Sequence, residues 1–319
     1  MSDDPTALSH RLASALLAGD GALCELRVAE PATRRDRFLV LSQIYDLHRA
    51  PLHRVGDRAR WQHHPTVCSL KGRLEHDWLA ELERHPVPAV APERTGEEMQ
   101  AIAARNRAPA AYGWIAEQAP WELALRFLAL EGGPDDLFDD LVATCQVGLP
   151  LGPAKMELAG NYWDEMGNGC FGEVHNVLYR QFAEAVDLPE VPRDEQPVEA
   201  LERAALLGLL ATNRWLQPEL IGALGLIELE AGPQCRYVER GLHRLRAPEG
   251  AHDFYAMHAA VDPLHGKGWV ENAVAPLVTE VPEWAPRILR GAVWKSVVNE
   301  GFFGWAERAL MPAARPAPA

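Results

Sequence analysis

The stretch 161-NYWDEMGNGCFGEVH-175 decides how the chain is interpreted, because a helical pattern that ends in two acids is broken before a histidine follows. Asp164 and Glu165 end the pattern, and Gly167 and Gly169 then interrupt it. His175 follows Glu165 after nine intervening residues. Such a stretch is either a solvated helix end or part of a metal site, and the other segments of the chain decide between the two.

The helical period of this stretch predicts which of its side chains point into the protein. It assigns the apolar stripe to Ala159, Tyr162, Trp163 and Met166, and the opposite, solvated face to Glu157, Asn161, Asp164 and Asn168. Asp164 is therefore expected to face solvent. Glu165 lies on the rim between the two faces, where a carboxylate can turn inward.

Composition and charge exclude several classes of function. The chain has 319 residues, 48% of them hydrophobic, which suffices for a buried core in two domains or in one large domain with an extension. Its 31 basic and 45 acidic residues give a net charge of −14, which argues against binding of nucleic acid or of an anionic membrane. No apolar run is long enough to span a membrane, and the acidic N-terminus lacks the layout of a signal peptide.

Cysteine and glycine motifs indicate neither a zinc ribbon nor a nucleotide site. The five cysteines are dispersed without a C-x-x-C pair, as expected for reduced thiols in the cytoplasm. The sequence GNGCFG, residues 167–172, matches G-x-G-x-x-G, but a dinucleotide fingerprint requires a preceding strand, and here a helical pattern precedes it. We therefore interpret this match as chance.

Helical periodicity dominates the chain and predicts an all-α fold. Strand patterns are scarce, and clusters of Gly and Pro separate the predicted helices, with one stop at Gly232-Pro233. We expect an N-terminal helical extension over residues 1–105, a helical core over 106–310 and a disordered tail over 311–319. His63 and His64 of the extension are adjacent, so they point apart on a helix, and both are interpreted as surface residues.

Two acids occupy positions that the helical period assigns to the core. In WELALRFLALEGG, Glu131 continues a stripe through Leu128, although it also stands beside a glycine at which the helix can end. In ELIGALGLIELEAG, Glu228 continues a stripe through Leu224, whereas Glu230 lies nearer the predicted stop and is expected to be solvated. A buried carboxylate is costly unless it is paired or bound to a metal.

The segment HAAVDPLH, residues 258–265, places His258, Asp262 and His265 on one face of a helix. Two imidazoles and a carboxylate on one face have the spacing of metal ligands. Pro263 follows Asp262 directly and cannot donate a hydrogen bond to the carbonyl four residues before it. We therefore expect the helix to kink or loosen here and to become ordered when a metal binds.

Together these segments resemble the haem-oxygenase-like diiron oxidases and oxygenases, also described as iron-containing redox enzymes. The family carries an acid on one core helix, E-x9-H on the next, an acid on a third and H-x3-D-x2-H on a fourth. The resemblance covers about residues 106–310 and implies a haem-oxygenase-like bundle. The positions that match as metal ligands and catalytic residues are Glu131, Glu165, His175, Glu228, His258, Asp262 and His265.

The chemistry of these seven side chains agrees with a dimetal site. Four carboxylates carry a charge of −4, which two ferrous ions balance, and three neutral imidazoles complete the ligand set. Mixed carboxylate and imidazole ligands suit iron or manganese better than softer metals. Asp139 and Glu230 are offset alternatives to Glu131 and Glu228.

The resemblance implies that two iron ions are the cofactor and that O2 is a co-substrate. A peroxo-bridged diferric species would then oxidise a small amine or amino-acid-like substrate, by N-oxygenation or by oxidative cleavage of a C–C or C–N bond. Relatives are often homodimers, and no nucleic-acid or membrane partner is expected. Tyr162, Trp163 and Phe171 are candidates for a pocket lining, although aromatic residues at helical spacing more often belong to a core.

Two other classes of function are compatible with the same residues. A metal-free enzyme on this scaffold, similar to the thiamin-degrading or cofactor-forming relatives, needs a nucleophilic cysteine, for which Cys145 and Cys170 are candidates. A helical binding protein without catalytic activity needs only that all the acids are solvated. The amount of iron bound per chain by anaerobically reconstituted protein separates these hypotheses.

Overall fold

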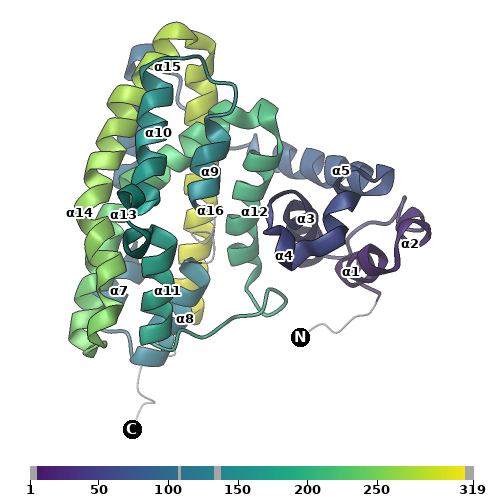
Figure 1. Cartoon of the computed structure of the whole chain (residues 1–319), viewed down its shortest axis with the longest axis horizontal. Helices are drawn as coiled ribbons and strands as arrows, with labels where there is room; N and C mark the ends of the chain where they lie inside the picture. Colours follow the sequence, from purple (N-terminus) through teal and green to yellow (C-terminus); the bar gives the residue numbers. More distant parts are fainter. Residues whose placement is uncertain (1–5, 107–108, 133–137, 313–319) are drawn as a thin grey trace. The chain divides into compact units, whose positions relative to one another are not determined.

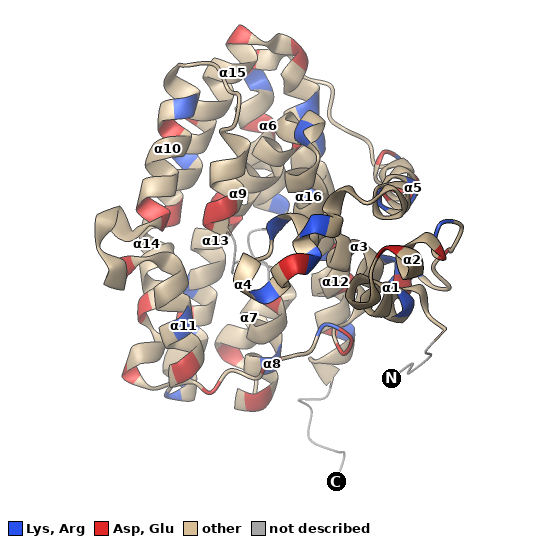
Figure 2. Ribbon diagram, turned by 45° about the vertical axis from the view of Figure 1, so that its right-hand side comes forward, with Lys and Arg blue, Asp and Glu red and all other residues tan. Residues whose placement is uncertain are grey.

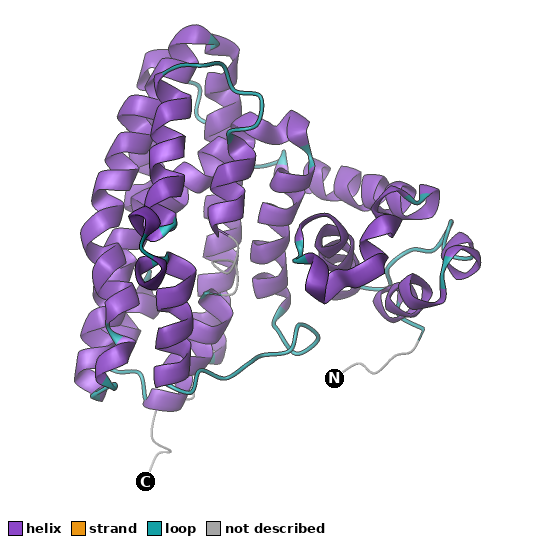
Figure 3. Cartoon of the chain, viewed as in Figure 1, coloured by secondary structure: helices purple, strands orange, loops and turns teal. Residues whose placement is uncertain are grey.

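The computed structural model describes residues 6–106, 109–132 and 138–312, and these residues form helices and connecting loops without a strand (Figure 3). They divide into two compact units, residues 1–86 with 191–214 and residues 87–190 with 215–319. The expected all-α fold is confirmed. The division into an extension and a core at residue 105 stays a prediction, and residues 313–319 of the predicted disordered tail lie outside the described residues.

The first unit is built around α3 and α12. Its helices are α1 (Leu8–Ala18), α2 (Asp20–Cys24), α3 (Arg34–Arg49), α4 (Leu52–Val55), α5 (Pro65–Leu82) and α12 (Val198–Thr212). The α3 helix begins where Thr33 accepts a hydrogen bond from the Asp36 backbone N–H, and the buried Asp36 carboxylate accepts the N–H groups of Leu8 and Ser9. Gly208 of α12 leaves room for Tyr45, because a Cβ there would lie 2.3 Å from that ring.

The second unit is a bundle arranged around the long helix α13 (Figure 1). Its helices are α6 (Thr95–Asn106), α7 (Ala110–Glu117), α8 (Trp121–Glu131), α9 (Phe138–Cys145), α10 (Pro153–Glu165), α11 (His175–Ala185), α13 (Gln217–Leu245), α14 (Asp253–Gly268), α15 (Ala275–Glu280) and α16 (Ala285–Ala309). Helices α13 and α16 approach closely at Gly222 and Gly291, where a Cβ would lie 1.9 Å from a carbonyl oxygen of the other helix. Helices α6 and α7 pack against both α13 and α16.

The predicted stop at Gly232-Pro233 is wrong, because α13 continues through both residues. Gly232 instead marks a close approach between α13 and α14: a Cβ at this position would lie 2.9 Å from Pro263 Cδ. Continuation of the helix also changes the surroundings of Glu230, which was expected to be solvated. Glu230 is buried and accepts a hydrogen bond from Asn299 Nδ2 at 3.0 Å.

The helix α14 also continues through its proline, at Pro263. Pro263 leaves the carbonyl of Ala259 without its helical donor, and Arg236 Nη1 of α13 donates to that oxygen at 3.2 Å. The expected loosening of the helix at this point is therefore absent in the described structure. A π-helical turn, η8 (Trp269–Val274), follows directly and leads into α15.

Charged residues of both signs are interspersed along the helices of each unit, and Figure 2 shows no continuous basic strip on the described ribbon in that view. An ion-pair network of three residues joins two helices of the second unit. Glu219 of α13 is fully buried and is held by Arg287 and Arg290 of α16. No helix among the described residues is both long and apolar enough to cross a membrane.

Candidate metal centre

Three helices of the second unit bring Glu165, Glu228 and His265 together inside the bundle. Each offers one ligand atom, and these atoms all lie within 4.8 Å of one another. Glu165 ends α10, Glu228 lies midway along α13 and His265 lies near the end of α14. All three are buried, with exposed fractions of 5%, 4% and 7%. Two carboxylates held this close without solvent repel each other, so the arrangement favours a cation between them.

The repulsion between these carboxylates is visible in the proton affinity of Glu165. Burial and the charge of Glu228 raise the pKa of Glu165 well above its usual range. Burial alone would lower the pKa of His265, but the carboxylates of Glu228 and Asp164 outweigh it and raise this pKa to about 10. Without a metal, the cluster therefore retains protons that a bound cation would displace.

The orientation of His265 leaves one ring nitrogen directed at the cluster. Its Nε2 donates to Asp164 Oδ2 at 3.1 Å, because a carboxylate only accepts. Its Nδ1 lies 3.5 Å from Glu228 Oε2 but makes no hydrogen bond with the described residues. In a metal-ligating histidine a carboxylate typically orients one imidazole nitrogen, and a metal at the other nitrogen would displace its proton.

His175 contacts the cluster through Glu165. Its Nδ1 lies 2.7 Å from Glu165 Oε2, yet the two atoms lack the angle of a hydrogen bond, and Nδ1 has no other partner among the described residues. Burial, together with the charge of His265, lowers the pKa of His175 to about 4. A buried, neutral imidazole at this distance from a carboxylate has the geometry of two ligands directed at one point.

The glycine-rich break after α10 positions His175. Two 3-10 turns, η4 (Gly167–Gly169) and η5 (Phe171–Glu173), connect α10 to α11, which begins at His175. Gly167 has φ of +60°, and a Cβ there would lie 2.6 Å from the backbone of Glu173. The glycines of the G-x-G-x-x-G match thus serve a tight turn after a helix, which agrees with the interpretation of the match as chance.

His258 extends the group on the other side of His175. The two rings lie 4.6 Å apart between centroids. Nδ1 of His258 donates to the Phe254 carbonyl at 2.9 Å, so Nε2 holds the lone pair. Burial, together with His175, lowers the pKa of His258 to about 3. The ring is therefore neutral and oriented by its own helix.

The two remaining predicted ligands differ in their surroundings. Asp262 is 2% exposed, lies one turn after His258, and its charge contributes to the raised pKa of His265. Glu131 is half-buried at the last residue of α8 and is not among the three residues brought within 4.8 Å. Its offset alternative, Asp139, accepts a hydrogen bond from Asn176 Nδ2 at 2.9 Å. The charge of Asp139 adds to the raised pKa of Glu165 and partly offsets the lowering of the His175 pKa. Asp139 thus acts electrostatically on the cluster.

A region of the chain matches a known protein family. The family model described as iron-containing redox enzyme matches residues 126–297, more than half of the chain. The chain belongs to the iron-containing redox enzyme family. The match includes Glu131, Glu165, His175, Glu228, His258, Asp262 and His265. A comparison with curated proteins gives no match.

The buried cluster of this iron-containing redox enzyme fits iron. Mixed carboxylate and imidazole ligands suit that metal, and the ring nitrogens His175 Nδ1 and His265 Nδ1 are buried without a hydrogen bond to any described residue. Unpaired polar atoms in a protein interior are costly unless an ion or a water molecule satisfies them. The same two nitrogens face carboxylates, so a cation satisfies all of these groups at once.

Two residues that position this cluster were assigned to the solvated face of their helix by the sequence. Asn161 is buried and donates from Nδ2 to Glu228 Oε1 at 2.8 Å, and Asp164 binds His265. Conversely, Trp163 was assigned to the apolar stripe but is 53% exposed. Phe171, which follows the helix and was a candidate for a pocket lining, is 77% exposed. The predicted inward face of α10 is therefore wrong. The face that points into the bundle carries polar residues, which contact the cluster.

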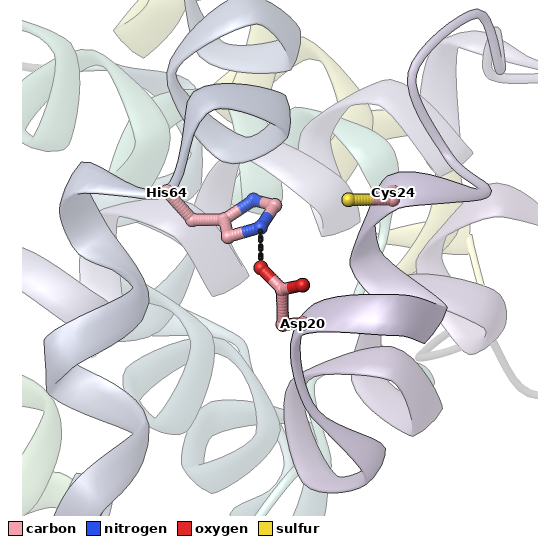
Figure 4. Close-up of side chains that lie close together, drawn as sticks. All are labelled: Asp20, Cys24 and His64. Atoms are coloured by element: carbon pink, nitrogen blue, oxygen red, sulfur yellow. Dashed lines mark hydrogen bonds and ion pairs between the residues drawn. The ribbon is translucent and has the colours of Figure 1, made fainter.

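The first unit contains a second group of ligand-type side chains, Asp20, Cys24 and His64, also within 4.8 Å of one another (Figure 4). Here both nitrogens of His64 are bonded. Nε2 contacts Asp20 Oδ1 at 3.0 Å, and Nδ1 accepts the Thr66 backbone N–H at 3.2 Å as the N-cap of α5. His64 is buried, so its assignment to the surface is wrong, whereas His63 is exposed. Asp20 and Cys24 are exposed.

Proposed function

We propose that this iron-containing redox enzyme is a non-haem diiron oxidase or oxygenase. It uses O2 and acts on a small amine or amino-acid-like substrate, by N-oxygenation or by oxidative cleavage of a C–C or C–N bond. The observation that carries the proposal is the buried group in which Glu165, Glu228 and His265 converge while a second imidazole, His175, contacts Glu165. The alternative of a non-catalytic binding protein requires that these acids are solvated, whereas Glu165 and Glu228 are buried.

The ligand set in this proposal is Glu131, Glu165, His175, Glu228, His258, Asp262 and His265. Glu165 is the best supported of these ligands, because it approaches both the His175 side and the Glu228 side of the group. Asp139 is the alternative to Glu131, since its charge acts on Glu165 and His175. Glu230 is a weaker alternative to Glu228, because Asn299 of α16 binds it.

Ferrous iron, when bound, supplies the electrons that reduce O2. The protein residues hold and orient the ligands. Asp164 fixes the His265 ring, and Asn161 fixes the Glu228 carboxylate. His175 and His258 are neutral at pH 7, because their pKa values are lowered to about 4 and about 3, so their free nitrogens need lose no proton before binding a metal.

The metal-free alternative finds little support at Cys145. Its thiol is buried and donates to the Val142 carbonyl, and burial raises its pKa, so it is not a thiolate nucleophile at pH 7. Cys170 is exposed in the turn between α10 and α11. Exposure alone does not activate a thiol.

Iron content of anaerobically reconstituted protein tests the proposal. We expect two iron ions per chain in the natural protein and fewer in Glu165→Ala. Glu173→Ala is the matched control, because Glu173 is an exposed acid in the η5 turn of the same segment. Two irons per chain in Glu165→Ala would contradict the ligand assignment, and no bound iron in the natural protein would contradict the proposal as a whole.

Oxygen consumption by the reconstituted protein tests the chemistry separately. Stopped-flow mixing of the ferrous protein with O2, in the presence of a panel of amines and amino acids, is expected to show oxidation of iron that one substrate accelerates. Iron binding without any reaction with O2 would limit the protein to metal binding and contradict the oxygenase assignment.

A further inference from the structure

A cleft of about 410 Å³ opens between α10 and the end of α14 in the second unit. This volume suits a small organic molecule. Two of the lining residues belong to the surroundings of the metal centre: Asn161 donates to Glu228, and His265 lies 3.5 Å from that carboxylate. Asn161 and His265 therefore lie between the cleft and the metal centre and contribute to both.

The polar groups of this cleft are mostly hydrogen-bond acceptors. The lining residues are Pro153, Met156, Glu157, Gly160, Asn161, Asp164, His265 and Asn272, with no lysine or arginine among the described residues of the lining. Because Asn161 uses Nδ2 to donate to Glu228, its Oδ1 is an acceptor, and this buried atom has no hydrogen bond from any described residue. Asp164 shares its charge with His265, which leaves Glu157 as the main uncompensated carboxylate.

Two residues across the cleft, one at the end of α14 and one in the following turn η8, hold Glu157 in place. Asn272 Nδ2, in the π-helical turn η8, donates to Glu157 Oε2 at 3.0 Å. Gly268 gives the carboxylate room, because a Cβ there would lie 2.0 Å from Glu157 Oε1. π-Helical turns are rare and frequently occur at functional sites, where the extra residue redirects a side chain. Glu157 is thus positioned by contacts across the cleft.

We propose that this cleft binds the ammonium group of a cationic amine substrate. Glu157 supplies the countercharge, and Asn161 Oδ1 and Asp164 accept hydrogen bonds from the N–H groups. An ammonium has three donors and no acceptor, which complements a wall of acceptors. A carboxylate at the same place meets the like charge of Glu157, while the charge of Asp164 is shared with His265. The inference rests on the proposed function and narrows its substrate class from amino-acid-like molecules to amines whose bound end carries no negative charge.

Binding of simple probes to the metal-free protein tests this inference without requiring turnover. We expect n-butylammonium to bind the natural protein, measured by calorimetry or ligand-detected NMR at constant ionic strength, and butyrate not to bind. Glu157→Gln is expected to weaken n-butylammonium binding about 10-fold through loss of a charge-assisted hydrogen bond. Glu271→Gln, an exposed acid on the same π-helical turn outside the cleft, is expected to leave binding unchanged.

A second variant moves the carboxylate without removing its charge. Gly268→Ala places a methyl group against Glu157 Oε1 and is expected to weaken n-butylammonium binding several-fold while retaining the helix, since alanine is a better helix former than glycine. Equal binding of butyrate and n-butylammonium, equal effects of Glu157→Gln and Glu271→Gln, or equal competition by potassium ions would overturn the inference.

The outcomes also separate this inference from the proposed function. Iron binding and O2 reactivity without Glu157-dependent binding of n-butylammonium would retain the diiron proposal and overturn the substrate class. Glu157-dependent binding in a protein that takes up no iron would support an amine-binding cleft and overturn the diiron proposal.

Discussion

The two units of the molecule each gather three side chains of the types that bind metals, but they satisfy them differently. In the first unit, both nitrogens of His64 are bonded within the protein, and its two companions are exposed. In the second unit, the nitrogens that face the carboxylates at His175 and His265 make no hydrogen bond with the described residues, and the carboxylates are buried. Proximity of ligand-type residues is therefore weak evidence for a metal. Buried, unsatisfied ligand atoms are stronger evidence, because the protein bears their cost.

The largest expected contrast between the two groups is in iron affinity and metal-free stability. Glu165→Gln removes one of the repelling carboxylates, so it should lower iron affinity more than the roughly 10- to 100-fold typical of outer residues. The same change should stabilise the metal-free protein at pH 7 by about 1 kcal/mol or more. Burial of Glu165, with its raised pKa, costs either a buried charge or the uptake of a proton, and glutamine requires neither. Iron titration and urea unfolding of the metal-free protein measure both.

Asp20→Asn is the matched change in the first unit. Asp20 is exposed, so its substitution should leave iron affinity unchanged and should not stabilise the metal-free protein. A Glu165→Gln protein that is less stable without metal than the natural protein would show that the second cluster is satisfied as it stands, and the contrast between the units would disappear.

A smaller effect is expected at Asp164, which orients His265. Asp164→Ala should weaken iron binding by about 10- to 100-fold, while a sufficient excess of iron still fills the site. The free iron concentration at half-saturation measures this effect. If Asp164→Ala instead lowers the iron content at saturation, Asp164 itself is a ligand.

A still smaller effect is expected at the first cluster, where His64 acts as a cap. His64→Ala should destabilise the protein by about 1–2 kcal/mol, because it removes the N-cap of α5 and the bond to Asp20. His64→Asn should recover much of that loss, since asparagine is a good N-cap. Chemical unfolding measures both variants, and loss of iron from either one would contradict the separation of the two groups.

The smallest effect is expected at Cys24. Cys24→Ser should change the free energy of unfolding by less than about 0.5 kcal/mol, because the thiol is exposed. Cobalt(II) added to the natural protein should produce no thiolate charge-transfer absorption that Cys24→Ser removes. Such a band would identify a metal site in the first unit and would break the comparison directly.

The sequence predicted the fold class and the family, because both depend on patterns that repeat along the chain. Helical periodicity is visible throughout, and the spacing of Glu165 to His175 and of His258 to His265 is specific enough to suggest the family. The ligand role of these residues stays a prediction. Their spacing is consistent with the turn at Gly167 that returns the chain to His175.

The surroundings of the site were not predictable from hydropathy. Periodicity assigns polar residues to solvent, so it placed Asn161 outside and Trp163 inside, the reverse of the structure. It also gave no sign that the partly exposed Asp164 orients His265. The same method ended a helix at Pro233, because it has no information about the partner helix. In each case a contact with a residue distant in sequence overrides the local preference.

The contact between Arg236 and the Ala259 carbonyl has a consequence for how the protein takes up its cofactor. It satisfies the backbone at Pro263 from a neighbouring helix, so the proposed ligands on α14 are held in place by protein contacts alone. Removal of iron by a chelator should therefore leave the helices around the metal centre folded. Far-ultraviolet circular dichroism should be the same before and after removal of iron, and reloading should proceed without refolding.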